Sequence, residues 1–159
     1  MKKVLSVFLV IIMCFTLAGC GSKDIELTTL NYDDYLVLNL NYGMGGRTDD
    51  LVNKAAGTTC YSAIEPNFKI SAASNNFVYN NVRITIRIYG TYKAWSFAGL
   101  FLGKKDGEIK ELDETITISC NVGGSGSYSD LIYLDEYSNL KALNIAYEVV
   151  SVSGSVTPV

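Results

Sequence analysis

Residues 82–89 alternate apolar and polar side chains with a period of two, and this pattern limits the possible folds more than any other feature of the chain. The apolar residues are Val82, Ile84, Ile86 and Ile88, and the residues between them are Arg83, Thr85, Arg87 and Tyr89. Successive side chains of a β-strand point to opposite faces, whereas an α-helix repeats its apolar residues every three or four positions. The segment is therefore predicted to be a strand with one buried face.

The same period recurs at residues 35–42, 115–120 and 142–152. We expect weaker strands at Thr59–Ile64, Phe68–Ala72, Ala94–Leu102 and Leu131–Leu134. Clusters of turn-forming residues separate these segments, at Asn75-Asn76, Asn80-Asn81, Lys104–Gly107 and Gly123–Gly126. About seven or eight short strands predict an all-β fold, a two-sheet antiparallel sandwich that is immunoglobulin-like in the broad sense. A small closed barrel is the main alternative.

One short helix is predicted at Thr48–Gly57. Thr48 can cap its first turn, Asp49 and Asp50 place negative charge where the helix dipole favours it, and Gly57 can end it.

The first 19 residues have the layout of an export signal. Lys2 and Lys3 precede an apolar stretch from Val4 to Phe15, and small residues follow it. The 16 residues from Val4 to Gly19 are too few for a membrane-spanning helix, which needs about 20. An ordinary secretory signal is one interpretation, but the sequence Leu17-Ala18-Gly19-Cys20 resembles the lipobox of bacterial lipoproteins.

This resemblance implies a processing route and a location. Residues 1–19 would be removed as a signal peptide, Cys20 would carry lipid such as palmitate, and residues 20–30 would form a tether. Residues 31–159 would form a single β-sandwich domain at the extracytoplasmic face of the cell membrane. More than one acyl chain gives stable anchoring, so the membrane itself is the first expected partner.

The lipoprotein interpretation also predicts what happens to each of the four cysteines. Cys14 would leave with the signal and Cys20 would be lipidated, so Cys60 and Cys120 remain for each other. Outside the cytoplasm such a pair is expected to form a disulfide, which would close a loop of about 60 residues and add roughly 4 kcal/mol. Two buried free thiols are the alternative.

Composition argues against several classes of function. The chain has no His, which removes Ser-His-Asp and Cys-His catalysis and most catalytic zinc sites. We therefore assign no catalytic residue, no metal site and no cofactor. The 16 acidic residues outnumber the 13 basic ones, giving a net charge of −3, and no basic block is present. Nucleic acid is consequently not an expected partner.

Tyr92 and Trp95 are the candidate ligand-binding residues, because aromatic rings bind sugars and peptides where they are exposed. The alternative is that Trp95 and Phe97 lie on one face of a strand and alternate into the core. The loops at 43–57 and 122–130 are further expected contacts. The leading hypothesis is a lipid-anchored, non-enzymatic binding module for an envelope protein or a glycan. The alternatives are a small envelope enzyme acting on cell-wall or carbohydrate material, and an accessory subunit of a membrane complex.

Overall fold

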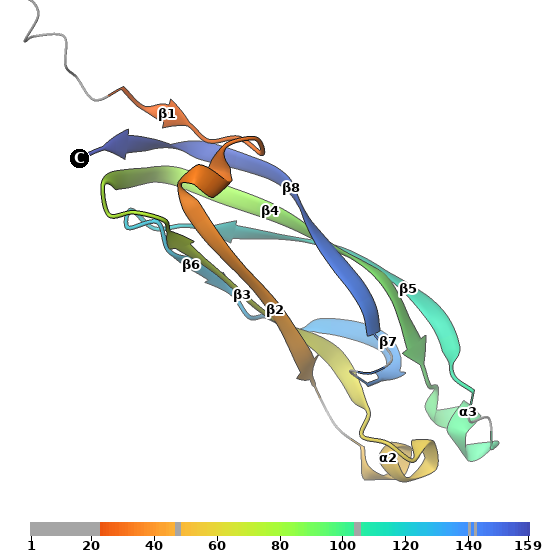
Figure 1. Ribbon diagram of the computed structural model, residues 1–159. Helices are drawn as coiled ribbons and strands as arrows, with labels where there is room; N and C mark the ends of the chain where they lie inside the picture. Colours follow the sequence, from red (N-terminus) through yellow and green to blue (C-terminus); the bar gives the residue numbers. More distant parts are fainter. Residues whose placement is uncertain (1–22, 47–48, 104–105, 140, 142) are drawn as a thin grey trace, which may run out of the picture.

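The protein is described here by a computed structural model, which covers residues 23–46, 49–103, 106–139, 141 and 143–159. Two antiparallel β-sheets face each other and enclose one main hydrophobic core (Figure 1). This confirms the predicted all-β, two-sheet antiparallel sandwich. Over these residues each sheet ends in edge strands, so the alternative of a single closed barrel is wrong.

The first sheet has the strand order β1-β8-β4-β5. Its strands are β1 (Ile25–Glu26), β8 (Leu143–Pro158), β4 (Phe77–Ala94) and β5 (Glu108–Ser119). The period of two noted in the sequence belongs to the central strand β4, whose Ile84 and Ile86 are fully buried. Burial of a β-branched side chain contributes about 1.5–3 kcal/mol, which explains why this strand lies at the centre.

The second sheet has the order β2-β3-β6, and β7 also pairs with β3. A short 3₁₀ helix, η1 (Tyr32–Asp34), leads into it. Its strands are β2 (Leu36–Gly45), β3 (Tyr61–Ala72), β6 (Gly126–Tyr128) and β7 (Ile132–Ser138). Strands β2 and β3 pair over ten residues with no shift of register.

Pro66 lies inside β3, where the sequence predicted a break between two strands. Pro66 has no N–H to donate, so a strand tolerates it only where no donor is needed. On this edge of β3, β7 pairs only as far as Ile64 and β6 begins at Phe68. Pro66 falls in the gap between them, and the chain runs on as one strand.

Two short helices complete the fold, α2 (Asp50–Ala56) and α3 (Phe97–Phe101). The first confirms the predicted helix, although its cap is Asp49, whose side chain accepts from the backbone N–H of Leu51 at 2.9 Å. Thr48, the cap expected from the sequence, lies outside the described residues. The prediction of a strand at Ala94–Leu102 is wrong, because α3 occupies most of that segment.

The two ends of the sandwich differ (Figure 1). Strand β1 and the carboxyl terminus lie at one end, and α2 and α3 lie at the other, which we call the tip. Strand β4 runs between them, and its 18 residues span about 60 Å at the usual rise of a strand. The predicted signal peptide and Cys20 lie outside the described residues. In the part of the chain that the structure covers, no helix is long and apolar enough to cross a membrane.

Candidate binding site

The tip is built where the chain passes from strand β4 into helix α3. After Ala94, Trp95 exchanges backbone hydrogen bonds with Tyr137, at 2.8 and 3.3 Å. The side-chain oxygen of Ser96 then accepts from the backbone N–H of Gly99 at 3.0 Å. An N-terminal cap of this kind stabilises a short helix by about 1 kcal/mol, so the turn into α3 is fixed at Ser96.

A small hydrophobic cluster, separate from the main core, holds α2 and α3 against the sheets. Its buried members are Val52, Cys60, Trp95 and Leu100. The ammonium group of Lys93 lies 5.6 Å from the centroid of the Trp95 ring, within the range of a cation–π contact. Trp95 is therefore the central side chain of the tip.

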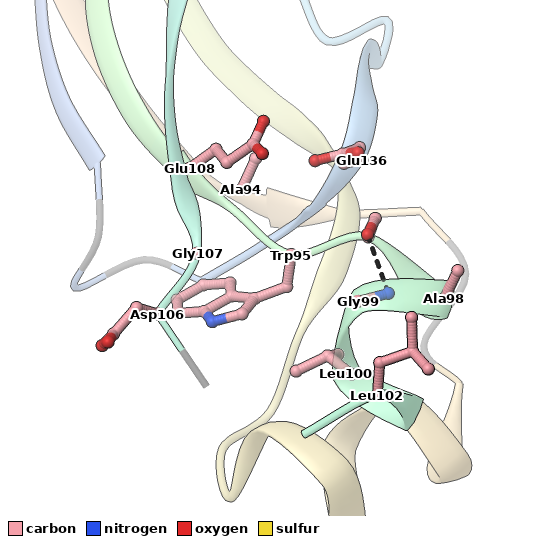
Figure 2. Close-up of a pocket in the computed structure, with 11 residues that line it drawn as sticks. Ala94, Trp95, Ala98, Gly99, Leu100, Leu102, Asp106, Gly107, Glu108 and Glu136 are labelled. Atoms are coloured by element: carbon pink, nitrogen blue, oxygen red, sulfur yellow. Dashed lines mark hydrogen bonds between the residues drawn. The ribbon is translucent and has the colours of Figure 1, made fainter. Parts of the chain in front are cut away.

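A pocket of about 240 Å³ opens beside this cluster (Figure 2). Trp95 forms one wall, and the side chains of Leu100 on α3 and of Leu102 directly after α3 lie below it in the view of Figure 2. The carboxylates that line the pocket belong to Asp106, Glu108 and Glu136. The carboxylates can accept hydrogen bonds from hydroxyl or ammonium groups of a ligand, and the Trp95 wall can contact its apolar part. Over the described residues, no three His, Cys, Asp or Glu side chains are grouped to hold a metal ion.

Large apolar side chains are exposed on the two tip helices and directly after α3. They are Leu51, Phe97, Phe101 and Leu102, which we call the tip patch, with exposed fractions between 45% for Phe97 and 80% for Leu102. The rings of Phe97 and Phe101 pack together with their centroids 4.8 Å apart. Clustered exposed apolar side chains mark interaction sites in folded proteins.

The two ligand-binding residues predicted from the sequence are buried. Tyr92 is 3% exposed because it continues the set of β4 side chains that point into the core. Trp95 is 9% exposed, and its ring packs in the small cluster. The expectation of an exposed aromatic pair is therefore wrong, although Trp95 does line the pocket.

Sequence reasoning missed the aromatic residues that are exposed at the tip, Phe97 and Phe101. It assigned them to a strand, in which Phe97 would have alternated into the core. The missed signal is Ser96, a residue type that favours the first position before a helix. Of the two loops expected to make contacts, the one at 43–57 reaches the tip through α2. The loop at 122–130 lies towards the other end, where the Val122 carbonyl accepts from Tyr79 N–H at 3.1 Å.

The predicted Cys60–Cys120 disulfide is not formed, and both residues are free thiols. Cys60 belongs to the cluster around Trp95, whereas Cys120 donates its backbone N–H to the Val82 carbonyl at 2.9 Å. Val82 and Trp95 stand 13 positions apart along β4, or about 40 Å. A disulfide requires Cα atoms about 4.4–6.8 Å apart, so the prediction is wrong.

We expect both thiols to be alkylated in the denatured chain without prior reduction. In the native protein, burial raises the pKa of both thiols, so their thiolate fractions at neutral pH are small. Native alkylation should therefore be at least about tenfold slower than in the denatured chain, and slowest at the fully buried Cys60. Mass spectrometry of the modified peptides measures both. A peptide pair joined through Cys60 and Cys120 would contradict this expectation.

Charged residues of the first sheet pair with each other on its outer face. Arg87 donates to both carboxylate oxygens of Asp113, at 2.7 and 2.8 Å, and to Glu148 at 3.3 Å. The Arg87 guanidinium lowers the pKa of the Asp113 carboxyl. Arg87 is thus neutralised by its neighbours. All three side chains are well exposed, so the network contributes little to stability.

Comparison of the chain with protein-family models, with curated proteins and with solved structures found no match.

Proposed function

We propose that the protein is a lipid-anchored, non-enzymatic interaction module at the extracytoplasmic face of the membrane, and that it binds an envelope protein through its tip. The observation that carries this proposal is the position of the tip patch, which lies at the end of the sandwich opposite β1 (Figure 1). A lipid on Cys20 would precede the first described residue, Lys23, by three positions. Anchor and tip patch would therefore stand at opposite ends.

The chemistry of the tip favours a protein over a glycan. Phe97 and Phe101 offer apolar rings without a polar atom, and Leu51 and Leu102 extend this surface. Aromatic and aliphatic anchors with polar groups at the rim are typical of protein interfaces. The rings that would have formed a sugar platform, Tyr92 and Trp95, are buried. The acidic side chains of the pocket would then pair with polar groups at the rim.

Crosslinking in cells tests the binding role. A photoreactive residue at Ala98, which is exposed on α3, is expected to capture one protein consistently. The double variant Phe101→Ser/Leu102→Ser should reduce this capture at least about tenfold, because loss of one buried apolar anchor costs about 1–2 kcal/mol at an interface. Yield of the crosslinked product, measured against total protein, is the readout.

The matched control is Leu30→Ser, which removes an exposed leucine near the β1 end. This variant should leave capture unchanged. Equal capture by the tip variant and the control, or capture of glycan without protein, would contradict the proposed role of the tip patch.

The anchor is tested separately by Cys20→Ser. Without its thiol the residue cannot be lipidated, so the variant should not be processed as a lipoprotein. Fractionation should find an unprocessed chain by mass, while wild type carries the added mass of acyl groups on Cys20. A wild-type chain of unmodified mass that is nevertheless retained by the membrane would overturn the proposed anchor.

A further inference from the structure

Edge strand β2 of one sheet and strand β8 of the other, which β1 covers only at Ser155 and Val156, lie on the same side of the sandwich. The hydroxyl of Tyr147 on β8 donates to the backbone carbonyl of Leu40 on β2 at 2.8 Å. The ring of Tyr147 also packs against Phe68, with centroids 5.8 Å apart. One side chain therefore bridges the two sheets where no strand-to-strand hydrogen bond joins β2 to β8 among the described residues.

This side of the core is only partly covered. Leu36 of β2 and Val156 of β8 are buried, but the other core-facing apolar side chains of the two strands are only partly buried, and they are Leu38, Leu40, Tyr42, Met44, Leu143, Ile145, Val149 and Val152. Strand β5 is also an edge strand, yet its core-facing Leu112, Ile116 and Ile118 are buried. The lower burial of core-facing side chains is therefore a property of this side of the sandwich and not of edge strands in general. We call the side between β2 and β8 the open seam.

Most of the backbone of the open seam also lacks a partner strand, although the Leu40 carbonyl accepts from Tyr147. Among the described residues, β2 pairs only with β3 over residues 36–45, and β8 pairs with β1 only at Ser155 and Val156. Because the Leu40 carbonyl points away from β3, alternate residues of β2 present their N–H and C=O groups at the outer edge. Residues 143–153 of β8 have no strand on their outer side within the described part of the chain.

Strand β2 carries none of the features that prevent edge-to-edge pairing, and residues 143–153 of β8 carry only Glu148 and one register shift, at Val150. Charged side chains, prolines and bulges normally protect an exposed edge. Strand β2 has no charged residue, no proline and no bulge, and Glu148 is the single charged residue of β8. Edge strand β5, by contrast, has charged residues at positions 108, 110, 111, 113 and 114. In a chain with 29 charged residues among 159, the open seam is nearly uncharged.

The directions of the two strands identify what fits the open seam. Strand β2 runs from the β1 end to the tip, and β8 runs from the tip back to the β1 end (Figure 1). A second copy, rotated by half a turn about an axis parallel to the strands, would place its β8 antiparallel beside β2. Its β2 would by the same rotation lie antiparallel beside β8. A single two-fold axis thus satisfies both edges at once.

We propose that the protein forms a symmetric dimer through the open seam, in which β2 of each copy pairs with β8 of the other. The first sheet of each copy then continues, through its β8, into the second sheet of the other copy. The partly buried side chains of the two open seams cover one another. Both β1 ends lie at one end of the dimer and both tips at the other. A two-fold axis perpendicular to the strands would reverse one copy and join β2 only to β2 and β8 only to β8, so the parallel axis also suits two anchors in one membrane.

The register of the dimer follows from its symmetry. A two-fold rotation about this axis produces no shift along the strands, so residues at one level stay at that level. Leu40 and Tyr147 lie at about the same level within one copy, because the Tyr147 hydroxyl donates to the Leu40 carbonyl and the Tyr147 ring packs against Phe68, the register partner of Leu40. Across the interface Leu40 then faces Tyr147 of the second copy, and the neighbouring antiparallel pair is Asn41 with Ala146. Both members of this pair are exposed in the single chain.

A double cysteine variant, Asn41→Cys/Ala146→Cys, tests this pairing in the full chain in cell membranes. The two positions lie on opposite outer faces of one sandwich, so they cannot join within a chain. Mild oxidation is expected to give a covalent dimer in which peptide 41 is linked to peptide 146. The control Asn41→Cys/Thr117→Cys moves the second thiol to β5, across the same sheet, and should give no such dimer.

The mass of the full chain in mild detergent, measured by light scattering, gives an independent readout. We expect a dimer, and expect Asn39→Asp/Asn41→Asp to weaken it about tenfold or more, because the new carboxylates face Glu148 of the second copy. The matched control Asn67→Asp makes the same change on β3 and should leave the dimer intact. A monomer at every concentration, or crosslinking of position 41 to a different protein instead of position 146, would overturn the proposal. Neither result bears on binding at the tip, which is read from Phe101→Ser/Leu102→Ser.

Discussion

Gly90→Ala is expected to lower the free energy of unfolding by about 3 kcal/mol. Gly90 lies inside β4, nearer its tip end, with φ of +145°, a backbone conformation that residues with a side chain rarely adopt. A Cβ atom at this position would overlap the Asn144 carbonyl oxygen and would lie 2.9 Å from the Cα of Ile145. Both contacts are backbone of β8, so relief requires the two longest strands to move apart.

Urea unfolding followed by circular dichroism measures this effect, and the midpoint should fall by about 1–2 M. Gly43→Ala is the matched control, because nothing lies within 4 Å of a Cβ built at Gly43. That variant is expected to be neutral or slightly stabilising, since alanine restricts the unfolded chain. Equal stability of the two variants would mean that β4 and β8 do not approach closely at Gly90.

Trp95→Ala is expected to cost about 3–5 kcal/mol, the range for truncating a large buried aromatic side chain. Trp95 contacts both tip helices through Val52 and Leu100, so the loss falls on the tip more than on the main core. Hydrogen exchange should therefore increase at backbone amides of α2 and α3 and change little at the centre of β4.

The matched control is Tyr133→Ala, which truncates a tyrosine that is 72% exposed on β7. Surface substitutions of this kind change stability by about 0.5 kcal/mol or less. Uniformly faster exchange throughout the Trp95→Ala chain would show that the tip and the main core unfold as one unit, contrary to the separate clusters.

The sequence predicted the buried faces of the strands better than their ends. The alternation at 82–89 located the centre of β4, because a two-residue period depends only on which side chains leave water. Asn80-Asn81 indicated a turn, yet β4 continues through it, with Asn81 at φ of +50° and a register shift against β8. Asparagine adopts this conformation readily in turns and in bulges, so its presence does not distinguish them.

The candidate site could not be located from the sequence, because the sequence shows neither how far apart two residues lie in the fold nor which aromatic side chains are exposed. Cys60 and Cys120 both lie within predicted strands, but their separation depends on which end of the sandwich each strand reaches, and that is set by topology. Trp95 and Phe97 are two positions apart and were assigned to one face of a strand. The cap at Ser96 turns the chain into α3, so Trp95 is buried and Phe97 is exposed.

The length of β4 has a mechanical consequence. A pull between a membrane anchor before β1 and a partner held at the tip would act along the strands. The hydrogen bonds of an antiparallel ladder run perpendicular to its strands, so such a force loads the bonds between β4 and β8 together in shear. Strand β1 has only two paired residues and would detach first, lengthening the tether while the sandwich stays folded.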